Sequence, residues 1–148
     1  EDMARELDAR IAGVRDPWIR TLLERLLVED APRREAFLRA PAAKSMHHVH
    51  LGGLLEHTLS VAAMAEQASA HYPELNRDLL LAGTLLHDLG KTAELSYARS
   101  FGYTDAGNLL GHISLEADWI RRAAERLAPF PEELLLQLVK RFVVVQPV

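Results

Sequence analysis

The chain has 148 residues, of which 49% are hydrophobic and 26% charged. That length is enough for one compact domain with its own hydrophobic core, and the composition is typical of a folded protein rather than a disordered one. The absence of cysteine excludes disulfides, thiolate zinc sites and iron–sulfur clusters, so any metal must be bound by imidazole and carboxylate groups. The net charge of −4 excludes a protein that binds nucleic acid through overall positive charge.

Sequence features also bear on the location of the protein and on its ends. No apolar segment approaches the ~20 residues that cross a bilayer, and the charged first ten residues do not resemble a signal peptide. We therefore expect a cytoplasmic protein without a membrane partner. The chain begins at Glu1, and its last residue, Val148, closely follows an apolar run, which is consistent with cuts in a longer protein.

Helical periodicity dominates and no segment alternates like a strand, which predicts an all-α fold of about six helices. The first is predicted over residues 3 to 13 and ends near Gly13. Asp16 is predicted to cap the second, with Pro17 in its first turn. A short third helix follows Pro32 and is interrupted by the segment APAA at 40 to 43.

The next segment, 44 to 53, is predicted to be a loop that carries three histidines and ends in a tight Gly-Gly turn. A helix over 54 to 71 follows. Its periodicity predicts that His57 faces inward, on a buried stripe that consists of Leu54, Val61, Met64 and Ala68.

The segment 76 to 89 is apolar nearly all round and is predicted to be the central buried helix, with Gly90 as its stop. Residues 96 to 107 are predicted to be a loop and 108 to 127 a helix, on which His112 shares a face with Leu109, Trp119 and Ala123. Pro131 marks the start of a last apolar helix.

Four residues are candidate metal ligands. His87 and Asp88 lie about 100° apart around a helix, so an imidazole and a carboxylate can converge on one ion. Such a pair alone also occurs at ordinary helix ends, and His57 or His112 alone could be a hydrogen-bonded core histidine. Together they form a nitrogen and oxygen site that suits manganese, iron, nickel, zinc or cobalt better than calcium. The identity of the divalent ion, magnesium included, stays open.

Three segments carry a resemblance: MHHVHLGGLLEHTLSV at 46 to 61, LLAGTLLHDLGK at 80 to 91 and GHI at 111 to 113. They resemble the HD superfamily of metal-dependent phosphohydrolases, and within it the C-terminal HD domain of the YhaM family of 3′ to 5′ exoribonucleases. The likeness covers roughly 41 to 144. It implies a single HD-type domain over 1 to 148, with N-terminal helices in 1 to 40 and the metal site at the C-terminal end of the central helix.

The resemblance also implies roles for matched residues. His57 would be the first ligand, His87 and Asp88 the signature pair with Asp88 bridging, and His112 a ligand of a second metal. Lys91 would contact phosphate, and His47 and His48 would line the mouth of the substrate site. The alternatives are a solvated Lys91 near a helix C-terminus, stabilised by the helix dipole, and loop histidines without a role.

The implied mechanism is metal-assisted hydrolysis, in which the ion lowers the pKa of bound water. The implied substrate is a phosphate ester, either in a nucleotide or at the end of single-stranded RNA. In the family, the helix that matches KRFVV at 140 to 144 continues into SHHG and a later aspartate ligand, whereas VQPV stands here. The HD core is therefore expected to be abbreviated at its C-terminal end. Residues 1 to 40 contain no β-rich segment like the OB-fold that YhaM relatives carry before this domain, and the sequence does not determine whether a longer protein has one.

Three classes of function remain open. The first is an HD-type hydrolase, and the second is a truncated or degenerate HD module that binds metal or nucleotide without turnover. The third is a plain helical interaction domain, in which each inward histidine would need another hydrogen-bond partner. The sequence does not determine which phosphate ester is cut, how many metals bind or the oligomeric state.

Overall fold

The computed structural model describes residues 1–41, 51–93 and 105–144, and for 105–110, 112 and 141–144 it describes the backbone alone. The helices are α1 (Asp2–Ala12), α2 (Pro17–Glu24), the π-helical turn η1 (Arg25–Glu29), α3 (Ala31–Arg39), α4 (Gly53–His71), α5 (Arg77–Leu86), α7 (Asp105–Arg126) and α8 (Glu132–Val144). No strand occurs within these ranges, which confirms the prediction of an all-α fold. None of the described helices is long and apolar enough to span a bilayer.

The starts of the helices follow local chemistry. The Asp16 carboxylate accepts the N–H groups of Trp18 and Ile19, and Pro17 occupies the first turn of α2, as predicted. Asp30 accepts the N–H of Arg33 at the start of α3. Caps of this kind satisfy backbone donors that have no partner inside the helix, so they fix where each helix begins.

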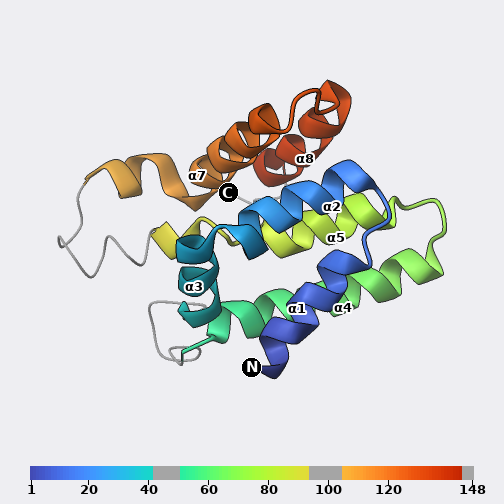
Figure 1. Ribbon diagram of the computed structural model, residues 1–148, viewed down its shortest axis with the longest axis horizontal. Coiled ribbons are helices and arrows are strands. Elements are labelled where there is room, and N and C mark those ends of the chain that lie inside the picture. The colour runs from blue at the N-terminus through green and yellow to red at the C-terminus, as the bar shows by residue number, and fades with distance from the viewer. Residues whose placement is uncertain (42–50, 94–104, 145–148) are drawn as a thin grey trace.

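Helix α5 lies in the middle of the fold. It packs against α2, α4 and α8, while α1 and α3 cover α4, and α7 packs on α2 and α8 (Figure 1). Its side chains Leu81, Leu85 and Leu86 are at most 1% exposed. The predicted central helix is confirmed, and three other helices pack against it.

Gly52 connects α3 to α4. It has a φ of 85°, a left-handed conformation that L side chains rarely adopt, and it forms the N-cap of α4. Its N–H donates to the carbonyl of Arg39, and the N–H of Leu54 donates to the carbonyl of Ala40. The predicted glycine turn thus ties the start of α4 to the end of α3.

The predicted buried stripe of α4 is wrong in part. Met64 is 59% exposed and the His57 side chain 46% exposed. The buried face is instead centred between Leu55 and Thr58, and it continues through Leu59, Ala62 and Ala65. At about 100° per residue, His57 lies roughly 120° from the centre of that face, so it stands at the flank of the helix instead of facing inward.

The end of α5 also differs from the prediction. The helix ends at Leu86 rather than Leu89, His87 is its C-cap, and residues 87–90 form a turn before helix resumes at 91. Gly90 is not a left-handed stop, because among the described glycines only Gly52 and Gly111 have a positive φ. The chain instead tightens into bonds between residues three apart, such as Leu89 N–H to the Leu86 carbonyl.

Helix α7 begins at Asp105, earlier than predicted, and is kinked. Gly111 interrupts it with a φ of 64° and a ψ of 162°. The side chains of Leu109 and His112 lie outside the described part of the chain, so their predicted common face stays a prediction. Beyond the kink, Trp119 and Ala123 pack against the core as partly buried side chains.

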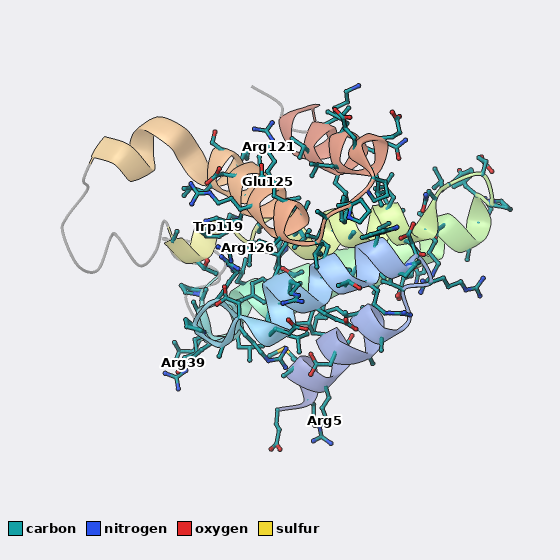
Figure 2. The ribbon with its side chains drawn as sticks, turned by 45° about the horizontal axis from the view of Figure 1, so that its top comes forward. Arg5, Arg39, Trp119, Arg121, Glu125 and Arg126 are labelled. Carbon is teal, nitrogen blue, oxygen red and sulfur yellow. The ribbon has the colours of Figure 1, made fainter. Side chains whose placement is uncertain are left out.

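The outer faces carry charged residues that pair locally. Figure 2 shows Arg5 and Arg39 at the outer side of α1 and α3, and Arg121 and Glu125 on the other side of the molecule, over α7. Arg5 pairs with Asp2 and Arg39 with Glu35, each within the same helix. Exposed pairs of this kind contribute little to stability, so the core and the caps hold the fold.

Candidate metal centre

Three candidate ligands meet where α4 passes the end of α5. His57 lies in the second turn of α4, His87 is the C-cap of α5, and Asp88 is the next residue in the turn. The Nε2 atoms of the two histidines are 3.4 Å apart, and Asp88 Oδ2 lies 3.2 Å from His87 Nε2 and 3.6 Å from His57 Nε2. The packing of α4 on α5 therefore brings together three of the four candidate ligands that the sequence singled out.

The spacing of these three atoms fits a metal ion. A circle through three points with these separations has a radius of about 2.0 Å, while metal bonds to imidazole nitrogen and carboxylate oxygen are about 2.0–2.2 Å long. One ion could therefore contact all three atoms at bonding distance. Two imidazoles and one carboxylate are also a donor set that divalent transition metals accept in proteins.

Thr84 orients one of the two histidines. His87 Nδ1 is 2.6 Å from the carbonyl oxygen of Thr84, one turn earlier in the chain. Because a carbonyl only accepts, Nδ1 must carry the proton, and the neutral ring then presents the lone pair of Nε2 to His57 and Asp88. Such a bond from the far side of the ring is typical of metal-binding histidines.

Asp88 is the most buried of the three, with 6% of the residue exposed. Burial opposes its ionisation, but the hydrogen bonds and positive charges of His87 and Lys91 outweigh burial and hold the pKa of Asp88 well below its usual range. For His87, burial lowers the pKa, but the hydrogen bond and charge of Asp88 outweigh it, and the net shift is upward. The Asp88 carboxylate is thus ionised, with the Lys91 ammonium group and the His87 ring beside it.

Lys91 lies on the same side of the turn. Its Nζ donates to Asp88 Oδ2 at 2.9 Å, and its side chain is 28% exposed. The lysine is therefore held against the candidate ligands rather than extended into solvent. Its predicted contact with phosphate remains a prediction.

The other predicted site residues lie outside the described side chains. His47 and His48 belong to the range 42–50, and of His112 only the backbone is described, one residue after the kink of α7. Their roles at the substrate mouth and at a second metal stay predictions.

Sequence reasoning missed Glu116. This residue of α7 is 0% exposed, its Oε1 accepts the N–H of Gly90 at 2.9 Å, and its Oε2 has no hydrogen-bond partner in the described part of the chain. Burial raises the pKa of Glu116 to about 9, and the charge of Asp88 adds to the shift. The available signal was periodicity, because Glu116 lies one turn before Ile120 and two turns before Ala124 on the apolar face of α7.

Comparison with known proteins gives one family. A family model of the HD domain matches residues 54–142, from the start of α4 to α8. That range is more than half of the chain and contains His57, His87, Asp88, Lys91 and Glu116. No solved structure matches the chain. On the strength of this match and of the helical fold that carries the His-Asp turn, the chain belongs to the HD domain family.

Proposed function

We propose that this protein is a metal-dependent phosphohydrolase that cleaves phosphate esters of nucleotides or of single-stranded RNA ends, with the ion held by His57, His87 and Asp88. The observation that carries the proposal is the separation of 3.2 to 3.6 Å among the two Nε2 atoms and Asp88 Oδ2. Membership of the HD family supports it, because that superfamily consists of metal-dependent phosphohydrolases.

A divalent ion in such a site lowers the pKa of a bound water and supplies a hydroxide nucleophile near neutral pH. The chain's own residues prepare the site. The carbonyl of Thr84 fixes the ring of His87, and Lys91 and His87 keep Asp88 ionised and ready to bind a cation. Lys91 also adds a positive charge beside the ligands, where it can contact a phosphate oxygen and stabilise the charge that develops there.

The exposure of the ligands indicates how a substrate would approach. The side chains of His57 and His87 are 46% and 32% exposed, whereas that of Asp88 is 8% exposed. The histidine side of the site therefore opens to solvent and the carboxylate side is closed. An overall charge of −4 favours a substrate that engages the site through one phosphate over a long polyanion bound along the surface. The preference for RNA ends rests on the resemblance to the YhaM family.

The test combines metal binding with turnover. We expect wild-type protein to bind Mn²⁺ in a calorimetric titration, and His57→Ala and Asp88→Ala to lose more than the roughly 10- to 100-fold that follows loss of a mere ligand-supporting group. His71→Ala is the matched control, because His71 is an exposed histidine on the same helix as His57.

Turnover is measured on bis(p-nitrophenyl) phosphate and on a single-stranded RNA with a free 3′ end. Metal-dependent release of p-nitrophenol or nucleotide by the wild type, lost in Asp88→Ala and retained in His71→Ala, is the expected result. Tight Mn²⁺ binding with no hydrolysis of either substrate would contradict the enzyme and favour a binding module. Equal Mn²⁺ affinity in wild type and Asp88→Ala would contradict the site itself.

A further inference from the structure

The turn that carries the candidate ligands depends on a residue from a distant helix. We infer that Glu116 is a positioning residue for the metal site: by accepting the N–H of Gly90, it holds Asp88 and Lys91 in the places where they meet His57 and His87. This inference rests on the proposed function and assigns a role in it to a residue outside the HD signature.

The backbone hydrogen bonds of the turn follow a regular series, and the side chain of Glu116 takes the place of one acceptor in it. The N–H groups of Leu89, Lys91, Thr92 and Ala93 each donate to the carbonyl three residues earlier, at 3.0 to 3.2 Å. The member of this series that would join Gly90 to His87 is not among these bonds. The N–H of Gly90 donates instead to Glu116 Oε1, at 2.9 Å. The side chain of Glu116 thus completes the turn in place of a backbone carbonyl.

Burial makes this contact important. Gly90 and Glu116 are both buried. Without the Glu116 side chain, the N–H of Gly90 would be buried with neither this acceptor nor water to bond to, which costs free energy. Glu116 belongs to the part of α7 that follows the kink, and this helix packs against α2, η1 and α8. The acceptor is therefore anchored outside the turn. Gly90 lies two residues after Asp88 and directly before Lys91, so its position limits where both side chains can point.

The second carboxyl oxygen explains which substitutions are informative. Glu116 Oε2 is buried and has no hydrogen-bond partner in the described part of the chain. A buried carboxyl in that setting is neutral, with Oε1 as the acceptor, so Gln reproduces its shape and its acceptor. Asp keeps the acid but withdraws the acceptor by one methylene. Met keeps approximately the length of the side chain and removes the acceptor.

The experiment compares Glu116→Gln, Glu116→Asp and Glu116→Met with Glu125→Gln, which alters an exposed glutamate on the same helix (Figure 2). Two quantities are measured: the Mn²⁺ dissociation constant by calorimetry, and hydrogen exchange of the Gly90 amide without metal. We expect Glu116→Gln and Glu125→Gln to keep the wild-type affinity within about threefold, and Glu116→Asp and Glu116→Met to bind Mn²⁺ about 10- to 100-fold more weakly. Exchange at Gly90 should accelerate in the latter two alone.

Mn²⁺ affinity is compared among variants that fold, as judged by circular dichroism and thermal unfolding. If Glu116→Asp does not fold, the comparison uses Glu116→Met. A folded Glu116→Met or Glu116→Asp protein with wild-type Mn²⁺ affinity would overturn the positioning role, even if its melting temperature fell, and would leave the proposed function intact. Slow Gly90 exchange in both variants would overturn it by showing that the hydrogen bond does not exist. Absence of Mn²⁺ binding by the wild type would overturn the proposed function, and the positioning role with it.

Discussion

Asp88 Oδ2 lies within 3.6 Å of three nitrogen atoms that can carry positive charge: Nε2 of His57, Nε2 of His87 and Nζ of Lys91. The carboxylate is closed off from solvent, and its charge is balanced by side chains of the chain itself. A metal ion at this place would share the oxygen atom that Lys91 now contacts. The ammonium group and the ion are therefore expected to compete for Asp88, which links the affinity for metal to the position of Lys91.

Glu116 carries a testable pH dependence. Its pKa is about 9 in the folded protein, raised by burial from an ordinary value of 4.5. Between these values the unfolded chain loses a proton that the folded chain keeps, so stability is full below pH 4.5 and falls as the pH rises toward 9. We expect Glu116→Gln, which cannot ionise, to become progressively more stable than the wild type over this window.

Urea unfolding at several pH values measures the difference. Glu125→Gln should show no such trend, because Glu125 is exposed. A constant free-energy difference between wild type and Glu116→Gln from pH 5 to about 9 would contradict a neutral Glu116 in the folded state.

At the scale of single residues, the group formed by His57, His87 and Asp88 was predictable and its surroundings were not. His57, His87 and Asp88 stand out because imidazoles and a carboxylate flank apolar helices, which is visible locally in the sequence. The exposure of His57 was misjudged, because Val61 and Met64 suggested a stripe that the packing of α1, α3 and α5 on α4 does not follow. Glu116 was missed because helical glutamates usually face water, and its partner is a backbone N–H 26 residues away.

At the level of elements, the start of α5 is coupled to the connection between α1 and α2. Asp78 Oδ2, in the first turn of α5, accepts the N–H of Arg15 at 3.0 Å and that of Asp16 at 2.7 Å. Asp16 in turn caps α2. One carboxylate therefore fixes the helix that carries the site relative to the N-terminal helices.

Replacing Asp78 by Ala should lower the free energy of unfolding by about 1–3 kcal/mol, since two backbone donors lose a charged acceptor. Chemical denaturation provides the measurement. Asp118→Ala is the comparison, because Asp118 is half exposed and pairs with Arg122 in the same helix. A loss of stability in Asp78→Ala no larger than that in Asp118→Ala would show that the hydrogen bonds to Asp78 do not stabilise the fold.

The kink of α7 depends on a glycine conformation. Gly111 has a φ of 64°, and a Cβ placed there meets no atom within 4 Å, so Ala would be strained by its backbone rather than by a clash. We expect Gly111→Ala to cost about 1–2 kcal/mol of stability. Gly13, with a φ of −78°, should accept Ala with little change. Thermal unfolding of both variants provides the measurement. Equal melting temperatures for Gly111→Ala and Gly13→Ala would contradict a left-handed glycine at the kink.

Most of the predicted helix bounds lie within one residue of the observed ones, and the exceptions are the end of α5 and the start and kink of α7. A start is fixed by a cap and a proline within a few residues, as at Asp16 and Pro17. The end of α5 is fixed by bonds that include the one from Gly90 to Glu116, and the kink of α7 by a single backbone conformation. Contacts between residues distant in the sequence leave no local pattern to read.

For the whole molecule, the site depends on the core around α5. Leu85 is 0% exposed and lies two residues before His87 in the central helix. Leu85→Ala should lower the free energy of unfolding by about 2–5 kcal/mol through lost burial and the cavity left behind. Leu136→Ala, at a position of α8 that is 47% exposed, should cost far less. Denaturant unfolding checks both, and similar losses would contradict the central place of α5.

The most direct test of the metal centre is anomalous scattering from crystals of the wild-type protein grown with Mn²⁺. The expected result is a peak about 2.0–2.2 Å from His57 Nε2, His87 Nε2 and Asp88 Oδ2, with Lys91 displaced from its contact with Asp88 or sharing its oxygen. A fully occupied peak elsewhere with none at these three residues, or ligand atoms more than about 5 Å from any common ion position, would contradict the site.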